Sequence, residues 1–329
     1  MGVVASGEAV GERSEQTYKK GYSAPSQLRD NIKHAHQTRL AVTVTSAVVD
    51  IATVGGVGLV AGVAVTRLPW WAAGFVVLAG AMVIGRQLRG LENLVHEGSH
   101  YNWSRHHRRL NDALTVGLAA APVGAKVQDY RAGHLRHHGR FGTDHDPDLQ
   151  RYRELDLEAM DRNSRGTFTL SILRRFPSYQ RGWLREVGAD SLWSLVPFLW
   201  AGLIVVAPAI ALAGTSAARG AGAAWVLGYL AALPLLRLVA EASEHVYTDS
   251  STMFDATISN LGWVQRYILH PHNDGYHTIH HMWPGIPHHQ LARVHRTLML
   301  HDPDGYGARL RYRATIRQRP IRSGQAVAR

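Results

Sequence analysis

Long apolar runs alternate with strongly polar stretches along this chain. Four apolar runs occur, at about residues 40–66, 69–86, 192–214 and 221–240. Each is close to or above the roughly 18–20 residues that a helix needs to cross a bilayer. The pattern predicts an all-α integral membrane protein, in which four transmembrane helices form two hairpins and the polar stretches form a helical cap.

The third apolar run is the clearest and the first is the weakest. Residues 192–214 read LWSLVPFLWAGLIVVAPAIALAG, with no charge and with tryptophans in the first half, as in helices anchored at the membrane interface. The first run contains Asp50 and several glycines, so a buried helical hairpin of a soluble protein stays open as an alternative for it. Residues 113–124 are apolar but too few to span, which predicts a helix at the membrane surface.

Charge then predicts the orientation. The chain has 36 Lys and Arg and a formal charge of +11, yet each hairpin link holds a single basic residue, Arg67 or Arg219. Because positive charge gathers on the cytoplasmic side, we expect both termini and the cap to be cytoplasmic. Arginine outnumbers lysine and Ala, Gly and Val are frequent, which indicates a GC-rich bacterium and its inner membrane. The basic residues accompany membrane spans rather than a nucleic-acid motif, so no nucleic-acid partner is expected.

This pattern predicts three regions. Residues 1–39 form a cytosolic tail and a pre-membrane helix, without the apolar core of a secretory signal. Residues 40–301 form the membrane domain, whose cap comes from 87–191 and 241–301. Residues 302–329 form a basic C-terminal tail.

Histidine carries the candidate chemistry, because the chain has 20 histidines and no cysteine. Three segments repeat helical spacings: HEGSH at 96–100, HLRHH at 134–138 and HTIHH at 277–281. Residues three or four apart lie on one helix face, close enough to share a metal. With one further histidine, four residues after Glu241, the set has nine members: His96, His100, His134, His137, His138, His245, His277, His280 and His281.

Nine imidazoles exceed the four ligands that a zinc ion usually takes. They suit two transition-metal ions with mostly nitrogen ligands, and iron is the natural choice for oxygen activation. The absence of thiolate argues against Cu(I) and against iron–sulfur clusters.

With its boxes HxxxH, HxxHH and HxxHH placed in order across four apolar runs, the chain resembles the membrane fatty acid desaturase and hydroxylase superfamily. The continuations HHGRFGTDHDPDL and PHNDGYHTIHHMWPGIPHHQL are similar to the family's second and third boxes, and the likeness covers roughly residues 25–300. It implies that the nine histidines ligate two irons and that Glu241 stands where a polar residue can act in the metal shell. Side chains expected behind the ligands are Glu97, Asp144, Asp146, Asp148 and Asn273.

The resemblance also implies the reaction. We expect an O2-dependent di-iron oxidase that abstracts hydrogen from an unactivated C–H bond, most often desaturating a fatty acyl chain of a membrane lipid or a lipid-like substrate. Hydroxylation or ketolation of a lipid, a carotenoid or another apolar metabolite is the alternative within the same chemistry. Electrons would come from a separate acidic carrier, a ferredoxin with its reductase, which docks on the basic cytosolic face.

Other classes and other histidines fit less well. HEGSH also matches the HExxH pattern of zinc proteases, with Glu97 as general base, but that reading leaves two boxes unexplained. A membrane metal carrier would need ionisable residues inside the spans, which offer little besides Asp50. His288 and His289 follow a predicted WPGIP turn and are read as second-shell or surface residues, and His270 and His272 as surface residues.

Overall fold

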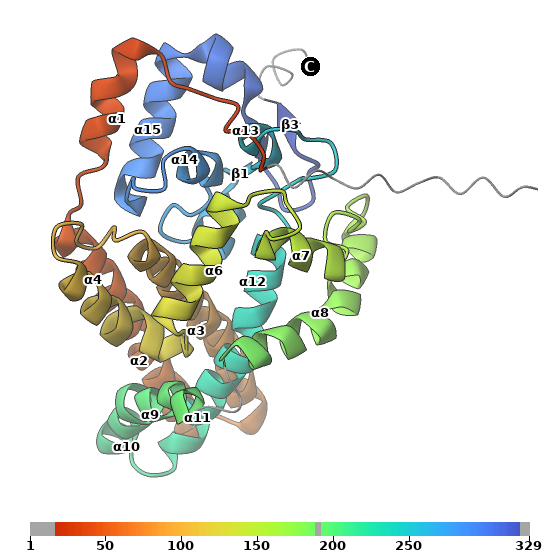
Figure 1. The fold of residues 1–329 in the computed structure, drawn as a ribbon. Helices are drawn as coiled ribbons and strands as arrows, with labels where there is room; N and C mark the ends of the chain where they lie inside the picture. Colours follow the sequence, from red (N-terminus) through yellow and green to blue (C-terminus); the bar gives the residue numbers. More distant parts are fainter. Residues whose placement is uncertain (1–16, 188–191, 323–329) are drawn as a thin grey trace, which may run out of the picture.

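The computed structural model describes residues 17–187 and 192–322. Residues 1–16 of the predicted cytosolic N-terminal tail lie outside the described residues. In Figure 1 the apolar hairpins form the lower part of the molecule and the remaining helices form a cap above them. Within the described ranges, four helices are long and apolar enough to cross a membrane, as predicted: Leu40–Arg67, Trp70–Ser99, Leu192–Ala213 and Ala217–Glu241.

The first hairpin consists of two uninterrupted helices, α2 (Leu40–Arg67) and α3 (Trp70–Ser99). The second hairpin is built from shorter pieces that follow one another almost without a break. Its segments are η3 (Leu192–Leu195), α9 (Val196–Ala201), η4 (Gly202–Val206), α10 (Ala207–Ala213), α11 (Ala217–Leu227), η5 (Gly228–Ala232) and α12 (Leu233–Glu241).

Proline explains the interruptions. The π-helical segments η4 and η5 each end two residues before a proline, Pro208 or Pro234. Proline has no N–H to donate and its ring clashes with the carbonyl four residues back, so the preceding turn widens instead of keeping the regular ladder. The same arrangement recurs outside the hairpins, where Pro122 follows a π-helical segment that ends at Ala120.

The two hairpins pack through small residues. A Cβ added to Gly220 of α11 would clash with the backbone oxygen of Ala61 on α2, and one added to Gly85 of α3 would come within 2.5 Å of the Cβ of Ala232. Glycine at these positions therefore allows the close helix approach that membrane bundles use in place of a hydrophobic driving force.

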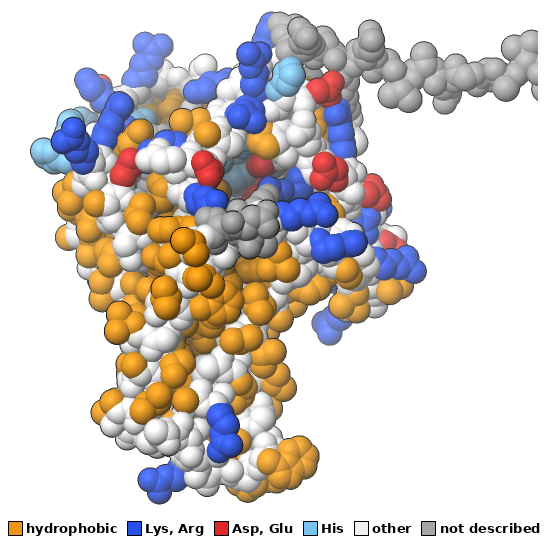
Figure 2. Space-filling view, turned by 60° about the horizontal axis from the view of Figure 1, so that its bottom comes forward, with side chains coloured by type: hydrophobic (Ala, Val, Ile, Leu, Met, Phe, Trp, Pro, Cys, Tyr) orange, Lys and Arg blue, Asp and Glu red, His pale blue; other side chains and the backbone are white. Residues whose placement is uncertain are grey.

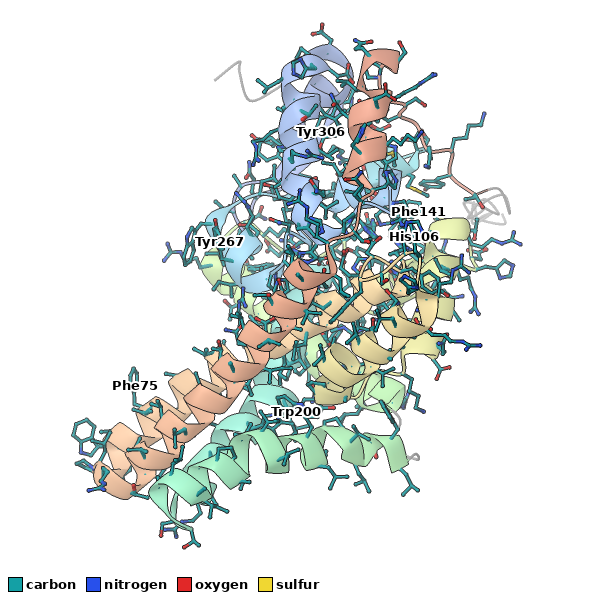
Figure 3. The ribbon with its side chains drawn as sticks, turned by 90° about the vertical axis from the view of Figure 1, so that its left-hand side faces the viewer. Phe75, His106, Phe141, Trp200, Tyr267 and Tyr306 are labelled. Atoms are coloured by element: carbon teal, nitrogen blue, oxygen red, sulfur yellow. The ribbon has the colours of Figure 1, made fainter. Side chains whose placement is uncertain are left out.

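Large apolar side chains cover the outer surface of the hairpins. Trp70, Phe75 and Leu203 are 85%, 73% and 70% exposed. Figure 3 shows Phe75 pointing away from its helix, and Figure 2 shows apolar side chains over most of the lower part of the molecule. A continuous apolar surface of this size fits lipid rather than water, so the chain is an integral membrane protein.

The cap is mostly helical. Its helical segments are η1 (Ser26–Leu28), α1 (Arg29–Ala35), α4 (Arg108–Leu114), η2 (Thr115–Ala120), α5 (Ala121–Val123), α6 (Val127–Gly139), α7 (Pro147–Glu154), α8 (Arg165–Val187), α13 (Met253–Ala256), η6 (Gln265–Leu269), α14 (His277–Met282), α15 (His288–His301) and η7 (Pro303–Gly307). The pre-membrane helix predicted within residues 1–39 corresponds to α1.

A small sheet ties the predicted C-terminal tail to the cap. The strands β1 (Ser259–Asn260), β2 (Arg311–Arg313) and β3 (Ile321–Arg322) lie in that order, with β1 parallel and β3 antiparallel to β2. Tyr306, just before the sheet, is fully buried in the core of the cap. Up to Arg322, the described part of this region therefore packs against the cap.

Candidate metal centre

The first histidine box lies at the cap end of the second apolar helix. α3 continues past its apolar part to Ser99, with His100 as its C-terminal cap, so His96 and His100 stand one turn apart on one face. The end of the helix is held by Asn102, whose N–H donates to the carbonyl of Glu97. The end of α3 thus places two imidazoles in the cap.

The other two boxes come from short cap helices. α6 carries His134, His137 and His138, and α14 carries the third box with all three histidines buried. The helix α14 ends at Met282, two residues before Pro284, because proline cannot continue the helical hydrogen bonds. His245 follows the end of α12 and lies in an isolated bridge with Thr257.

Five of the nine histidines form one group. Nε2 of His96 and Nε2 of His280 are 2.8 Å apart, as are those of His100 and His134. Nε2 of His138 lies 3.1 Å from that of His134 and 3.0 Å from that of His280. We call this set, His96, His100, His134, His138 and His280, the five-histidine group.

The remaining four histidines form a second group. Nε2 of His281 lies 3.3 Å from that of His137 and 3.2 Å from that of His277, and Nε2 of His277 lies 3.2 Å from that of His245. We call His137, His245, His277 and His281 the four-histidine group. The two groups adjoin, since the ring centroids of His138 and His281 are 4.5 Å apart.

Helix geometry explains how the boxes divide. Residues at i and i+4 lie nearly above one another, whereas i+3 is turned to the other side of them. In α6, His134 and His138 therefore enter the five-histidine group while His137 enters the other. In α14 the assignment is reversed, because His277 and His281 join the four-histidine group and His280 joins the five-histidine group.

The distances fit two metal ions. Imidazole nitrogen binds a metal such as zinc at about 2.1 Å, so two ligands at right angles on one ion are about 3.0 Å apart. The Nε2 separations of 2.8–3.3 Å within each group match that value. No thiolate is available, because the chain has no cysteine. An all-imidazole set is suited to iron rather than to Cu(I).

Burial keeps most of these imidazoles neutral, as ligation requires. Desolvation, reinforced by neighbouring histidines, holds the pKa of His134, His138, His280 and His281 well below the usual value. It is also the main cause that lowers the pKa of His277 to about 3. The lowered pKa favours the neutral imidazole, which is the form that can bind a metal ion.

Carboxylates orient one histidine in each group. Oδ1 of Asp146 lies 2.8 Å from Nδ1 of His137, and Oδ1 of Asp274 lies 3.3 Å from Nδ1 of His96. Such contacts fix the orientation of the ring and leave Nε2 available for a metal ion. Burial lowers the pKa of His137, but Asp148 and Asp146 outweigh it and raise the pKa to about 9, so a metal ion that bound there would displace a proton.

Some of the residues expected behind the ligands contact a histidine of the site, and others do not. Asp146 contacts His137, and Asp148 has an oxygen 3.5 Å from Nε2 of the same ring. Asp144 is exposed and pairs with Arg153. The Glu97 carboxylate accepts the N–H of His288, and Asn273 donates to the carbonyl of His288, so these two support the chain after the third box.

The structure places Glu241 in an ion-pair network rather than with the histidines. Its carboxylate accepts from Arg237 at 2.9 Å and from Arg151 at 3.2 Å. It belongs to none of the candidate metal groups among the described residues. Two guanidinium partners make it a poor direct ligand, because they compete with a cation for the same oxygens.

The sequence analysis did not predict a buried polar cluster that lies beside the two histidine groups. His270, read there as a surface residue, is fully buried, and its Nδ1 lies 3.5 Å from both Glu244 and Asp274. Arg89 lies within 3.7 Å of the same two carboxylates. Because Arg89 already balances these carboxylates, the cluster is an ion-pair network rather than a third metal site. The HNDG sequence around Asp274 was the only local signal for it.

His272 and Asp50 correct two further expectations. Nε2 of His272 lies 2.7 Å from Oδ2 of Asp50, and Arg86 lies 3.5 Å from the other oxygen. Asp50, the charged residue within the first apolar run, is thus paired with His272 and Arg86. His272 is a structural partner instead of a surface residue. His288 is also buried, against His272 and Thr43.

A cavity of about 450 Å³ opens onto the two histidine groups. Four of the nine histidines line it, His96, His134, His137 and His277, together with Tyr130 and Trp183. Figure 2 shows a hollow with charged side chains around it, at the border between the apolar lower part and the charged upper part. The cavity is therefore lined by members of both the five-histidine group and the four-histidine group.

Comparison with known proteins agrees with this geometry. The model of the fatty acid desaturase family matches residues 68–314, three quarters of the chain. The chain belongs to the fatty acid desaturase family. This desaturase-family chain is also similar to the dihydrorhizobitoxine desaturase of Bradyrhizobium elkanii. The two are 24% identical over 263 residues, which cover 72% of this chain and 70% of the relative.

Proposed function

We propose that the protein is an O2-dependent di-iron desaturase, which turns a carbon–carbon single bond of its substrate into a double bond. The observation that carries this proposal is the convergence of nine imidazoles into two groups with Nε2 separations of 2.8–3.3 Å. The relative's printed name, a desaturase, supports desaturation over the alternative of hydroxylation. The five-histidine group would hold one iron and the four-histidine group the other.

The reaction balances with an external donor. The substrate loses two hydrogen atoms, the donor supplies two electrons, two protons come from solvent, and O2 is reduced to two molecules of water. Iron supplies the oxygen activation that such unreactive C–H bonds require. The protein's own side chains place the substrate in the cavity, and Asp146 and Asp274 hold the rings of His137 and His96 in position.

A zinc protease is the weaker candidate. In that reading Glu97 would be a general base, but its carboxylate accepts the backbone N–H of His288 and is buried. It is thus committed to the fold behind the site. The reading also uses only a fraction of the converging histidines.

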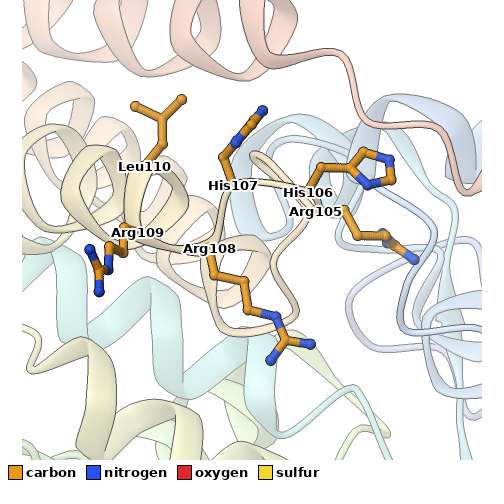
Figure 4. A pocket seen from close by; sticks show the side chains of 6 residues that line it. All are labelled: Arg105, His106, His107, Arg108, Arg109 and Leu110. Carbon is orange, nitrogen blue, oxygen red and sulfur yellow. The ribbon is translucent and has the colours of Figure 1, made fainter.

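The electron donor would dock on a basic surface above the third box. A hollow there is lined by Lys20, Arg29, Lys33 and Arg105, and among the described residues that line it none is acidic. Trp283 also lines it, directly after the helix that carries His280 and His281. Arg108 and Arg109, the first two residues of α4, add two more cations, and Figure 4 shows their side chains.

The position of this surface favours a soluble protein over lipid. In Figure 1, α1 with Arg29 and Lys33 stands at the end of the molecule away from the apolar hairpins. An acidic one-electron carrier of the ferredoxin type has the complementary charge, and its encounter would be fast and sensitive to salt. Both termini and the site would be cytoplasmic, as the positive charge of the cap predicts.

Metal content and product formation test the proposal together. The wild type, His280→Ala and the control His301→Ala, which changes an exposed histidine of α15, are purified and also expressed with a ferredoxin and its reductase. We expect iron and a product lighter by two hydrogens with the wild type and the control, and neither with His280→Ala. Equal iron and product in His280→Ala would refute the site, and a product heavier by one oxygen would make the protein a hydroxylase.

A further inference from the structure

The cap helix α8, which precedes the third apolar run, exposes apolar side chains although it lies outside the hairpins. Leu170, Leu173 and Leu184 are 46%, 59% and 41% exposed. Steps of three and eleven residues are close to whole turns of a helix, so the three side chains lie along one side of α8. The exposed Pro177 lies on the same side between them. We call Leu170, Leu173 and Leu184 the leucine stripe.

The core of the protein does not account for the leucine stripe. The side of α8 that packs inward carries Phe168, Tyr179 and Trp183, which are 7%, 4% and 3% exposed. At 100° per residue, these three residues lie on the other side of the helix from the leucines. A surface helix normally has one apolar side, which faces the core. Because α8 has two, the leucine stripe requires a second apolar environment.

A row of exposed arginines runs beside the leucine stripe. Its members are Arg174, Arg181 and Arg185, at steps of seven and four residues, and we call them the arginine stripe. Among residues 17–187 and 192–322, none of the three forms an ion pair with a carboxylate, whereas the neighbouring Arg175 pairs with Asp156 at 3.0 Å. The charge of the arginine stripe is therefore left for an anion outside the described chain.

The inward side of α8 contacts the second apolar hairpin. Nε2 of Gln180 donates to the carbonyl of Leu230 at 2.7 Å, and the ring centroids of Trp183 and Tyr229 are 5.1 Å apart. Leu230 and Tyr229 belong to η5, which is part of the fourth candidate membrane span. The leucine and arginine stripes are thus carried by a helix that packs directly on the membrane hairpins.

This contact lies near the cap end of the apolar part. Gly228, the first residue of η5, packs against α3, since a Cβ on it would come within 2.7 Å of the Ile84 side chain. Arg86, two residues further along α3, is the first charged residue of that helix. In Figure 1, α8 runs down to the top of the hairpins. In Figure 2, basic side chains lie among apolar ones on the part of the molecule that extends to the right above the hairpins. The helix therefore meets the hairpins at the level where acyl chains give way to headgroups.

We propose that α8 lies in the bilayer interface on the cap side, with the leucine stripe against the acyl chains and the arginine stripe against the phosphates of anionic phospholipids. A basic row beside an apolar row is typical of helices that lie at a membrane surface. Arginine suits this place, because its stem packs on apolar groups and its guanidinium binds phosphate. The surface continues the lipid-facing surface of the hairpins, so a soluble partner could reach it only by displacing lipid.

The proposal gives α8 a role beside the site but does not depend on the reaction. Trp183, on the inward side of the helix, lines the cavity that opens onto the two histidine groups. An α8 held by lipid on its outer side would therefore fix one wall of that cavity at the level of the headgroups.

Spin labels test where the leucine stripe lies. Because the chain has no cysteine, Leu173→Cys and Leu184→Cys each accept a single label in the full-length protein. The reference variants are Phe75→Cys on a hairpin and Leu300→Cys, which is 75% exposed at the end of α15 away from the hairpins. In vesicles of equal parts phosphatidylglycerol and phosphatidylcholine, we expect the ratio of collisions with O2 to collisions with a water-soluble nickel complex to be several-fold higher on the leucine stripe than at Leu300→Cys, as at Phe75→Cys.

Bound lipid tests the arginine stripe. The double variant Arg174→Gln/Arg181→Gln is extracted from the same vesicles in mild detergent, and the phosphatidylglycerol and phosphatidylcholine that stay bound are counted by native mass spectrometry. We expect the ratio of the two lipids to fall at least about fivefold, which is roughly what one basic residue contributes at an anionic surface. The matched control is Arg293→Gln/Arg296→Gln, which removes two exposed arginines of α15.

The two measurements separate lipid from other occupants. Labels on both leucines that are as accessible to the nickel complex as the label at Leu300→Cys would overturn the proposal, and would leave the surface to a soluble partner. An unchanged lipid ratio in Arg174→Gln/Arg181→Gln and in a second pair, Arg181→Gln/Arg185→Gln, would overturn it as well. An equal fall in the α15 control would show binding by overall charge instead of by α8.

Discussion

Replacing Asp146 by asparagine should loosen one of the two metals selectively. Asp146 is fully buried, and its Oδ1 accepts from Nδ1 of His137 at 2.8 Å and from the N–H of Asp148 at 2.9 Å. Its Oδ2 accepts from the N–H of Gly142 at 2.9 Å. In Asp146→Asn one of these donors must face an NH2 group, so the variant loses both the negative charge behind His137 and a buried hydrogen bond.

The structure sets the size of both effects. Removing the partner of a metal-bound histidine typically weakens metal binding by about 10–100-fold, which corresponds to about 1.4–2.7 kcal/mol. A buried donor left without an acceptor costs a further ~1–3 kcal/mol of folding free energy. Only the four-histidine group contains His137, so the metal of the five-histidine group should keep its affinity.

A chelator titration measures this difference. Iron per chain is determined after equilibration with increasing concentrations of a chelator, for the wild type, Asp146→Asn and Asp144→Asn. Asp144 is the matched control, because its side chain is 67% exposed and pairs with Arg153 at the surface. We expect half of the iron in Asp146→Asn to leave at about 10–100-fold lower chelator strength. A curve that overlays Asp144→Asn, or loss of both irons in one step, would refute the reasoning.

Three further predictions concern other parts of the molecule. Asp274→Asn should weaken iron binding by the five-histidine group, because Asp274 orients His96 of that group. The same chelator titration measures this effect, and weaker iron binding by the four-histidine group instead would contradict it. Lys33→Glu should raise the KM for ferredoxin about tenfold with little change in kcat, and the effect should shrink in high salt; steady-state kinetics at two ionic strengths measure it. Gly220→Val should lower the thermal midpoint in detergent by several degrees, since its side chain would clash with Ala61, whereas Gly222→Val, which meets open space, should not.

The local sequence predicted the helical form of the histidine boxes. Spacing at i, i+3 and i+4 placed the members of each box on one helix face, and α6 and α14 have that form. The crossed assignment, with His137 in one group and His134 in the other, follows from the same spacing but becomes visible only when the helices face each other. The sequence does not indicate which face of α6 packs against which face of α14.

The charged partners of the site could not be derived from spacing. Glu244 after α12 and Asp274 before α14 are many residues away from Arg89 on α3, yet both carboxylates lie within 3.7 Å of its guanidinium group. Each has an ordinary sequence context, and the sequence reading placed neighbouring His270 at the surface. A buried charge is tolerated only with a partner of opposite charge, and the position of a residue in the sequence does not indicate which residue that partner is.

The sequence by itself determined the four apolar spans, the helical boxes and an all-imidazole metal chemistry, because hydropathy, helical period and ligand type are local properties. Tertiary structure alone decided how nine histidines divide between two groups, that Glu241 joins arginines rather than metal, and that the adjoining cavity is charged. These features depend on contacts between segments far apart in the chain, such as Arg151 of α7 with Glu241 of α12, and only the packed fold brings such segments together.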